Sequence, residues 1–466
     1  MLAVLSVEEM RAVDAEALAR VSEDTLVERA GTAVATWAVR LLGGTYGRRV
    51  VVVAGKGNNG ADGRVAAERL RRRGARVTVV EAAEAPDHIG PAGVVDLVID
   101  AAYGTGFRGT YRAPSVPAGV PVLAVDVPSG VSGDTGEVSG EPLRADLTVT
   151  FAALKPGLLQ GAGPLLAGRV EVADIGLDVS RARTWVVEDT DVRRRLPPRP
   201  RDAYKWQTAL AVVAGSPGMT GAAGLCARAA YRAGAGMVRL GVPGHDTNDL
   251  PVPEAVGVAL PAENWADDAL AMSTRCRAMV VGPGLGRVES TVADVRAVVA
   301  QAATPVVVDA DGLFALGTGS QVEAVVRGGP GSPRPPAGVI LTPHEGEFTR
   351  LAGHAPAVDR IGDARRLAAH TGAVVLLKGP VTVVAHPEGD VLLATSGSPR
   401  LATAGTGDVL SGAIGAFMAR GLDPWHAGAL GAHVHGRAAE LGPPEGLVAG
   451  DVADLLARWL SGIRRA

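Results

Sequence analysis

In the first half of the chain, short apolar runs alternate with amphipathic stretches. Apolar runs of strand length are followed by polar turns, and the segments between them repeat apolar residues at helical spacing. This alternation predicts a parallel sheet covered by helices on both faces. The predicted strands are residues 49–54, 76–80, 94–99, 120–125 and 147–151, and the predicted helices are 7–18 and 64–73.

The pattern breaks at residues 193–202, where Pro and Arg replace the apolar period, and then resumes. We interpret the break as a linker. The second half predicts strands at 210–214, 278–281, 306–308, 339–341 and 374–377, a hairpin at 381–385 and 391–394, helices at 221–233, 409–418, 424–441 and 451–460, and a surface loop at 328–338. The halves do not resemble each other, so we expect two different α/β domains, residues 1–183 and 184–466.

Composition excludes several classes of protein. The 466 residues are 47% hydrophobic and carry a net charge of −3, which gives no electrostatic reason to expect nucleic acid or a membrane surface as partner. No apolar run approaches the ~18 residues of a membrane helix, and the N-terminal residues follow an amphipathic pattern rather than that of a signal peptide. Only two cysteines occur, so we expect a cytoplasmic protein. As partners we expect small molecules and further copies of the same chain.

The most informative motif is Gly405-Thr406-Gly407-Asp408, which directly precedes an apolar helical run. Glycines leave backbone N–H groups free to face an anion, and the start of a helix adds the positive end of its dipole. A carboxylate at Asp408 could accept the proton of a hydroxyl during phosphoryl transfer. The alternative is a Gly-rich turn in which Asp408 only stabilises the first turn.

A second glycine motif, residues 55–60, satisfies G-x-G-x-x-G after a predicted strand. With Glu81 at the end of the next strand, this pattern also fits a dinucleotide-binding dehydrogenase. Asn58, Asn59 and Asp62 argue against that reading, because they crowd polar groups into the turn and a carboxylate at Asp62 would repel a pyrophosphate.

Polar residues also follow the other strands of the first half. Asp100 and Asp126 each end a strand, and Ser129 lies just beyond the second. Oxygen atoms from Asn59, Asp100 and Ser129 could converge on a hard cation. The alternative for each residue is a cap of a helix or turn.

These segments together resemble the NAD(P)H-hydrate epimerase family over residues 1–180. The resemblance rests on six motifs in order: Met10…Asp14, residues 26–31, residues 55–63, Asp100…Gly104-x-Gly106, residues 126–130 and residues 155–157. It implies that potassium binds to Asn59, Asp100 and Ser129, and that Asp126 is the acid/base at C6 of the nicotinamide. The residues it implies for binding the hydrated nucleotide are Asn58, Asn59, Gly60, Ala61, Asp62, Gly104, Thr105, Gly106, Phe107, Arg108, Gly109, Thr110 and Asp126.

The second half has no G-x-x-x-x-G-K-[ST] loop, yet most of its predicted strands end in a ligand-type turn. These turns are residues 215–223, 282–286, 309–311, 342–347 and 378–379. Together with residues 405–408 they resemble the ribokinase-like fold, and within it the ADP/ATP-dependent NAD(P)H-hydrate dehydratases. One departure concerns Trp206, in Tyr204-Lys205-Trp206-Gln207, where this family usually has His-Lys-Gly. If this segment covered the active site, turnover would be affected.

The dehydratase resemblance implies that ADP or ATP phosphorylates the C6 hydroxyl of the hydrate and that phosphate then leaves. Asp408 would activate the hydroxyl, and magnesium would bridge the phosphates with Glu347 in its water-mediated shell. The resemblance implies hydrate contacts at Ala222, Gly284, Gly286, His344 and Asp408, and nucleotide contacts at Lys378, Gly379, Pro380, Val381, Thr382, Gly405, Thr406 and Gly407. For His344 alone, a structural role is the simpler reading.

We therefore expect a Rossmann-like parallel-sheet domain followed by a ribokinase-like domain, in a bifunctional enzyme that repairs hydrated NADH and NADPH. The first domain would interconvert the R and S hydrates, and the second would dehydrate the S form. Two alternatives remain open: a small-molecule kinase fused to a nucleotide-sensing domain, and a ligand-binding protein without catalysis. The sequence does not decide between ADP and ATP, although the resemblance to bacterial members favours ADP.

Overall fold

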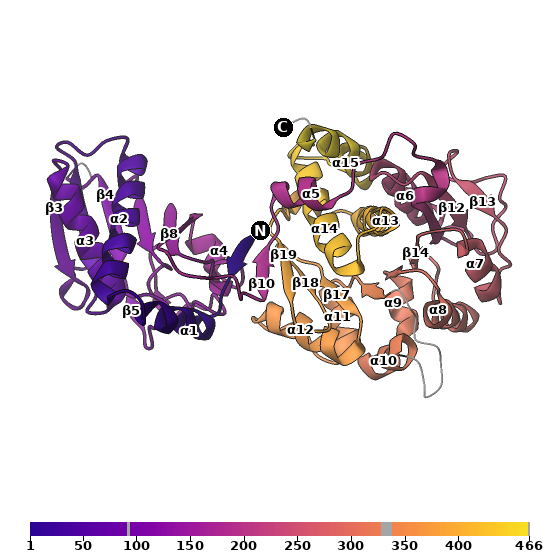
Figure 1. Cartoon of the computed structure of the whole chain (residues 1–466), viewed down its shortest axis with the longest axis horizontal. Helices are drawn as coiled ribbons and strands as arrows, with labels where there is room; N and C mark the ends of the chain where they lie inside the picture. The colour runs from indigo at the N-terminus through magenta and orange to yellow at the C-terminus, as the bar shows by residue number, and fades with distance from the viewer. Residues whose placement is uncertain (91–93, 328–337, 465–466) are drawn as a thin grey trace. The chain divides into compact units, whose positions relative to one another are not determined.

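The computed structural model describes residues 1–90, 94–327 and 338–464 (Figure 1). Its internal contacts divide the chain into two compact units, one of Leu2–Thr184 and one of Trp185–Ala466 with Met1. The loop predicted at 328–338 lies outside the described residues except for Gly338. Within the described ranges, no helix is long and apolar enough to span a membrane.

The first unit is built on a six-stranded parallel sheet in the order β3-β2-β4-β6-β8-β9. Its strands are β2 (Arg49–Ala54), β3 (Arg76–Glu81), β4 (Leu97–Ala101), β6 (Val122–Val125), β8 (Leu147–Phe151) and β9 (Arg169–Ala173), and β5 (Tyr111–Arg112) pairs separately with β7 (Gly140–Glu141). The strand order reverses at β2, between β3 and β4. In open α/β sheets, ligands bind at such a reversal, beyond the carboxyl ends of the strands.

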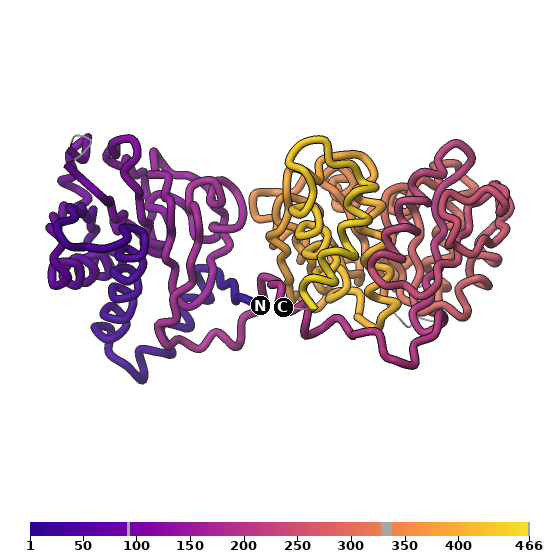
Figure 2. The backbone as a smooth tube through the Cα atoms, turned by 90° about the horizontal axis from the view of Figure 1, so that it is seen from above, coloured from indigo at the N-terminus to yellow at the C-terminus, as the bar shows by residue number. Residues whose placement is uncertain are grey.

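The two long helices of the first unit cover one face of this sheet. The helices of the unit are α1 (Val7–Leu18), α2 (Glu23–Leu42), α3 (Asn58–Arg72) and α4 (Gly163–Leu166). Helix α2 packs on α3 (Figures 1 and 2). Helix α2 buries Ala and Val side chains, and α3 buries Ala66, Ala67 and Leu70, in one cluster with residues of the sheet. The opposite face packs against irregular segments around Ile89, Val95 and Tyr111. Of the helical layers predicted on both faces, the described residues show α2 and α3 in one cluster and the single 3-10 turn Ala82–Glu84 in the other.

The sheet of the second unit runs from β19 through β18, β17, β16, β15, β14, β11 and β12 to β13. Strands β11 to β17 pair in parallel, whereas β18 joins β17 and β19 antiparallel. The bounds are β11 (Ala209–Val213), β12 (Met237–Gly241), β13 (Val256–Val258), β14 (Ala278–Val281), β15 (Val306–Val308), β16 (Val339–Leu341), β17 (Val374–Leu377), β18 (Thr382–Ala385) and β19 (Val391–Ala394). The short strand β1 (Leu2–Val4) belongs to the residues of the first unit, and β10 (Thr184–Val186) begins at the boundary between the units.

The core of the second unit forms where four helices pack on this sheet. These are α6 (Thr220–Arg232), α13 (Thr406–Ala419), α14 (Pro424–Glu440) and α15 (Ala449–Ile463). Helix α13 is buried from Val409 to Ala419, and a Cβ at Gly412 would lie 2.1 Å from the Cys226 carbonyl oxygen of α6. This close packing sets the position of the α13 N-terminus. The remaining helices are α5 (Asp189–Arg195), α7 (Ala266–Ser273), α8 (Glu289–Gln301), α9 (Asp311–Leu316), α10 (Gly319–Arg327), α11 (Glu345–Ala352) and α12 (Arg360–Thr371).

Candidate active sites

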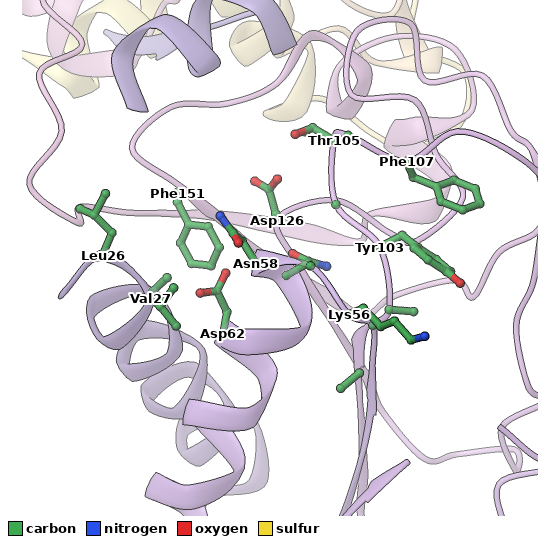
Figure 3. Close-up of a pocket in the computed structure, with 18 of the residues that line it drawn as sticks. Leu26, Val27, Lys56, Asn58, Asp62, Tyr103, Thr105, Phe107, Asp126 and Phe151 are labelled. Atoms are coloured by element: carbon green, nitrogen blue, oxygen red, sulfur yellow. The ribbon is translucent and has the colours of Figure 1, made fainter. Parts of the chain in front are cut away.

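A cavity of about 1000 Å³ lies at the carboxyl ends of the strands in the first unit (Figure 3). Of the residues predicted to bind the hydrate, those lining it are Asn58, Asn59, Asp62, Gly104, Thr105, Gly106, Phe107, Arg108 and Asp126. Gly60 instead supports the turn beneath, because a Cβ there would lie 1.9 Å from the Gly55 carbonyl oxygen. Ala61, Gly109 and Thr110 are chain neighbours of the lining residues. The structure thus brings most of the predicted set together around one space.

Asp126 is held in an unusual conformation at the end of β6. Its φ is +66°, in the left-handed region that non-glycine residues rarely adopt. Its Oδ1 lies 2.8 Å from the Lys155 Nζ and accepts a hydrogen bond of 3.0 Å from the Thr150 hydroxyl. Lys155 is 2% exposed and also donates to the Phe151 and Ala153 carbonyls. The buried ammonium therefore fixes one oxygen of the Asp126 carboxylate and leaves Oδ2 for a ligand.

A second carboxyl group in the cavity holds its proton far more strongly than a free aspartic acid does. Burial, and then the charge of Asp126, raises the pKa of Asp62 to about 8. Figure 3 shows Asp62 rising from α3 beside Phe151 and Asn58, within the same cavity as Asp126. The sequence-based prediction that Asp62 repels a pyrophosphate applies only if its carboxyl group is ionised. A protonated Asp62 instead presents a hydrogen-bond donor.

Asp14 also lines this cavity, although sequence reasoning gave it no role beyond a family motif. Burial raises its pKa, Lys155 lowers it, and Asp126 raises it further, with a net upward shift. The signal that could have found it is its position four residues after Met10 on α1, which places both on one side of the helix. Met10 lines the same cavity.

Two of the three predicted potassium ligands are in contact with each other. The Ser129 hydroxyl donates to Asp100 Oδ1 at 2.6 Å, and the Ser129 amide donates to Oδ2 at 2.9 Å. Asp100 is fully buried, and burial raises its pKa despite these hydrogen bonds. The amide nitrogen of the Asn59 side chain is buried without a partner among the described residues. That nitrogen is a hydrogen-bond donor, so only the amide oxygen of Asn59 could face a cation. The oxygens of a buried carboxylate, a hydroxyl and an amide are ligand types that fit a hard monovalent cation.

The second site centres on Lys378, at the carboxyl end of β17. Its Nζ lies 2.9 Å from Asp309 Oδ1 and 3.7 Å from Glu347 Oε2. Asp309 Oδ2 accepts a 2.7 Å hydrogen bond from the Ser411 hydroxyl of α13. Burial alone would raise the pKa of Asp309, but Lys378 and Ser411 outweigh it and lower the pKa. Asp309 directly follows β15, in one of the predicted ligand-type turns but without a predicted role, and no sequence motif indicates Ser411.

Asp408 lies in the first turn of α13, next to this ion pair. The helix begins after Gly405, whose φ of +88° is the left-handed conformation that glycine adopts freely. A Cβ at Gly407 would lie 3.6 Å from Lys378 Nζ and 3.7 Å from Asp309 Oδ2. Burial, and then Asp309, raises the pKa of Asp408 to about 7, while Lys378 opposes the shift. A carboxyl with this pKa suits general-base catalysis near neutral pH.

The predicted hydrate contacts of this unit fall into two groups. Ala222 and Gly284 pack together, since a Cβ at Gly284 would lie 2.9 Å from that of Ala222. His344 caps α11, because its Nδ1 accepts hydrogen bonds from the Gly346 and Glu347 amides. It therefore has the structural role that the sequence suggests for it. Its ring also lines a cavity of about 210 Å³ with Arg287 and Phe314. Asp311 links the two groups, because it accepts hydrogen bonds from the Gly286 amide and from Arg287.

The predicted nucleotide segment 378–382 turns from β17 into β18. Arg360, which sequence reasoning missed, donates to the Lys378 carbonyl at 2.8 Å, and a Cβ at Gly379 would lie 2.5 Å from its guanidinium. His435 was also missed; it is buried on α14, and burial, followed by the charge of Lys378, lowers its pKa to about 4. Both residues are far from Lys378 in sequence, so local patterns could not indicate them.

The Tyr204–Gln207 segment lies away from this site. It leads directly into Ala209, the first residue of β11, and so occupies the amino-terminal edge of the sheet, whereas the ligand turns follow the carboxyl ends. The Trp206 ring packs under the Arg275 guanidinium at 3.9 Å. The Gly-to-Trp departure is therefore not part of a cover over Asp408.

Comparisons with known proteins define first the class of fold. The second unit resembles the crystal structure of a ribokinase-like superfamily protein from Enterococcus faecalis, with a TM-score of 0.51 and 22% identity over 61% of this chain and 98% of that one. An ADP/ATP-dependent NAD(P)H-hydrate dehydratase from Bacillus subtilis, co-crystallised with ATP and Mg²⁺, is 31% identical over 59% of this chain and 97% of its own, with a TM-score of 0.48. The predicted ribokinase-like domain is confirmed.

The family follows from sequence. Residues 210–460 match the NAD(P)H-hydrate dehydratase model, and residues 23–91 and 81–157 match the YjeF-related protein N-terminus. The chain is 41% identical to the bifunctional NAD(P)H-hydrate repair enzyme Nnr of Mycobacterium tuberculosis, covering 91% of this chain and 90% of that protein. This chain belongs to the family of bifunctional NAD(P)H-hydrate repair enzymes. The predicted family is confirmed over the dehydrogenase and kinase-sensor alternatives.

Proposed function

We propose that this chain restores NADH and NADPH from their hydrates by two reactions, one in each unit. The first unit interconverts the R and S hydrates at C6, and the second dehydrates the S hydrate at the expense of ADP or ATP. The observation that carries the proposal is the placement of Asp408 at the N-terminus of α13, beside the Lys378–Asp309 ion pair. A base, an anion-binding helix end and a cation at one point are what phosphoryl transfer to a hydroxyl requires.

In the first unit, Asp126 acts as the acid/base at C6. The Lys155 ammonium orients its carboxylate, and the strained backbone directs it into the cavity. The hydrated nucleotide is held by residues 58–62 and 104–110. Potassium would be held by Asn59, Asp100 and Ser129. Its positive charge would stabilise the ionised form of the buried Asp100 carboxyl group, whose pKa burial raises.

In the second unit, Asp408 accepts the proton of the C6 hydroxyl as its oxygen attacks the terminal phosphorus of the nucleotide. The bond to the leaving AMP or ADP breaks, and the amides of residues 405–407 stabilise the transferring phosphoryl group. Phosphate then leaves C6 with the C–O bonding electrons, and loss of the C5 proton forms the double bond of NAD(P)H. Each step balances without an external oxidant or reductant.

The second unit would bind its two substrates through separate sets of residues around Asp408. Residues 378–382 and 405–407 hold the nucleotide, while Ala222, Gly284, Gly286 and His344 contact the hydrate. No group of three or more His, Cys, Asp or Glu side chains that could hold a metal occurs in the ranges that the structure describes. Phosphate oxygens would therefore supply most ligands of magnesium, with Glu347 reaching it through water. Assembly with further copies and a cytoplasmic location remain predictions.

The proposal is tested by supplying the wild-type chain with separated R and S hydrates and following the absorbance of reduced nicotinamide. We expect the S hydrate to be converted at once with ADP or ATP present and not without nucleotide. The R hydrate should be converted after a lag that shortens with more enzyme. No nicotinamide signal from folded protein with either nucleotide would overturn the proposal.

A further inference from the structure

A second large cavity of the second unit lies far from Asp408. It has a volume of about 710 Å³ and is lined by the 197–208 segment and by the C-terminal ends of α6, α13 and α15. Helix α13 starts at the phosphoryl-transfer site and ends at Arg420, which lines this cavity. Fourteen helical residues span about 21 Å, so the two places are at opposite ends of one rigid element.

The lining of this cavity is strongly basic. Its charged residues are Arg199, Lys205, Arg232, Arg420 and Arg464, and none of its lining residues is an Asp or Glu. Asp454 neutralises one of them, Arg232, at 2.9 Å. In contrast, the guanidiniums of Arg199, Arg420 and Arg464 donate to backbone carbonyls, of Gly234, Ala233 and Leu196 among others, and no ion pair to a described carboxylate involves them.

These three guanidiniums repel one another. Arg420 is only partly exposed, and burial, followed by the charges of Arg464 and Arg199, lowers its pKa to about 10. Carbonyl oxygens at the C-terminal ends of helices satisfy N–H groups and contribute about half a unit of negative charge per helix, but they do not supply the full countercharge that several guanidiniums require. An anion in the cavity would do so, and guanidinium groups bind phosphate oxygens in paired hydrogen bonds.

We propose that this cavity is a second nucleotide site, which holds the phosphates of a nucleoside diphosphate or triphosphate between Arg199, Arg420 and Arg464. Lys205, for which the described residues offer no ion pair, adds a fourth positive charge, and such nucleotides carry three to four negative charges. The volume exceeds that needed by phosphates alone. Tyr204, which is 59% exposed, and the apolar Pro198 and Leu460 provide a wall against which a base could pack.

A second nucleotide site would also give a role to the Tyr204–Gln207 segment, which departs from the family pattern. Tyr204 and Lys205 do not reach the phosphoryl-transfer site, yet both line the basic cavity. The segment is anchored there because the Gly236 amide donates to the Thr208 hydroxyl at 2.8 Å. The proposal does not depend on the hydrate chemistry of either unit.

The test is equilibrium titration of the full chain with ADP and, separately, with inorganic pyrophosphate. In a Lys378→Met background, which weakens the phosphoryl-transfer site, we expect saturable binding of both probes and tighter binding of ADP. The double change Arg199→Gln with Arg464→Gln should weaken both by at least tenfold, whereas the exposed Arg193→Gln control should not. In the wild-type background, the stoichiometry of ADP should fall from two to one per chain with the same double change.

Three results would overturn the proposal. They are the absence of a second ADP equivalent in the wild type, affinities that the double change leaves unaltered, and pyrophosphate binding without ADP binding. Since Arg199 and Arg464 are exposed, the double variant is expected to fold, and its dehydration rate at saturating nucleotide checks this directly. Arg420→Gln provides a third variant, whose unfolding is measured alongside because its side chain is more buried.

Discussion

The Lys155 ammonium, 2% exposed, lies 2.8 Å from a carboxylate oxygen of Asp126, whose backbone is in the left-handed region. Thr150 bonds to both partners, at 2.9 Å from Lys155 Nζ and 3.0 Å from Asp126 Oδ1. A buried ammonium thus determines the orientation of the proposed acid/base of the first unit. Removing the ammonium would leave carbonyl groups and a carboxylate unsatisfied in the same place.

Lys155→Met is expected to destabilise the first unit by ~3–5 kcal/mol, as for other buried pairs that lose one partner. Conversion of the R hydrate should fall at least tenfold, while dehydration of the S hydrate by the second unit continues. Denaturant unfolding and the two hydrate assays measure these effects. The matched control is Arg112→Met, which breaks the exposed pair with Glu141 and should cost less than ~1 kcal/mol. Equal effects of the two changes would contradict the account.

Asp62 should make stability depend on pH in a defined direction. Its pKa is raised from 3.8 to about 8 in the folded chain, so the folded state binds the proton more tightly than the unfolded state. Its stabilising contribution is complete below pH 4 and is lost as the pH rises toward 8. Asp62→Asn mimics the protonated form, so the variant should gain stability relative to wild type over that interval. Free energies of unfolding from a pH series check this.

The control for that series is Asp96→Asn. A hydrogen bond from the Arg49 amide lowers the pKa of Asp96 against a smaller opposing effect of burial, and Arg48 lowers it further. Its contribution is therefore present above pH 4 and lost as the pH falls, which is the opposite sign. Between pH 4 and pH 8, Asp96→Asn should therefore lower stability by an amount that does not vary with pH, whereas the gain from Asp62→Asn should grow with pH. The Asp62 account fails if that gain does not grow, or if both variants show the same pH dependence over this interval.

Dehydration should titrate with Asp408. Since the carboxyl must be ionised to accept a proton and its pKa is about 7, the single-turnover rate of the S hydrate should rise between pH 6 and pH 8 and then level off. Asp408→Asn should lower the rate by ~10²–10⁴-fold and abolish this rise. A variant that keeps both the rise and most of the rate would exclude Asp408 as the base.

Gly407→Ala tests the anion site without disturbing the fold. The added methyl group would make ordinary contacts of 3.6 Å and 3.7 Å with Lys378 and Asp309, so stability should stay within ~0.5 kcal/mol. The same methyl group would occupy the space next to the Lys378 ammonium, where a phosphate approaches, and the KM for nucleotide should rise at least tenfold. Gly450→Ala, in open space near the start of α15, should change neither quantity.

The sequence predicted buried strands well because parallel strands covered on both faces are continuous apolar runs. Strands β8, β14, β15 and β16 have the predicted bounds. Helix α2 was not predicted. Helix α3 begins at Asn58 rather than at the predicted Arg64; the sequence misses its first turns because Gly60 and Gly63 resemble turn residues. They are glycines for another reason: a Cβ at Gly63 would lie 2.5 Å from that of Ala101 on β4.

The residues of both candidate sites that lie in short sequence motifs could be predicted. Residues 55–63, 104–106 and 405–408 carry local signals, whereas the pairing of Asp309 with Ser411 joins positions 102 apart in sequence. Long-range partners of this kind are decided by how α13 packs on the sheet. The same applies to Arg360 and His435, whose relation to Lys378 exists only in the folded chain.

The most direct test of the central claim uses Asp126→Asn and Asp408→Asn, alone and mixed, on an equilibrium mixture of both hydrates with magnesium, potassium and nucleotide. Two independent reactions predict that Asp408→Asn forms no NAD(P)H and that Asp126→Asn rapidly converts only the S fraction. An equimolar mixture of the two variants should then convert all of the substrate at close to the wild-type rate. If the mixture converts no more than Asp126→Asn alone, the assignment of one reaction to each unit is wrong.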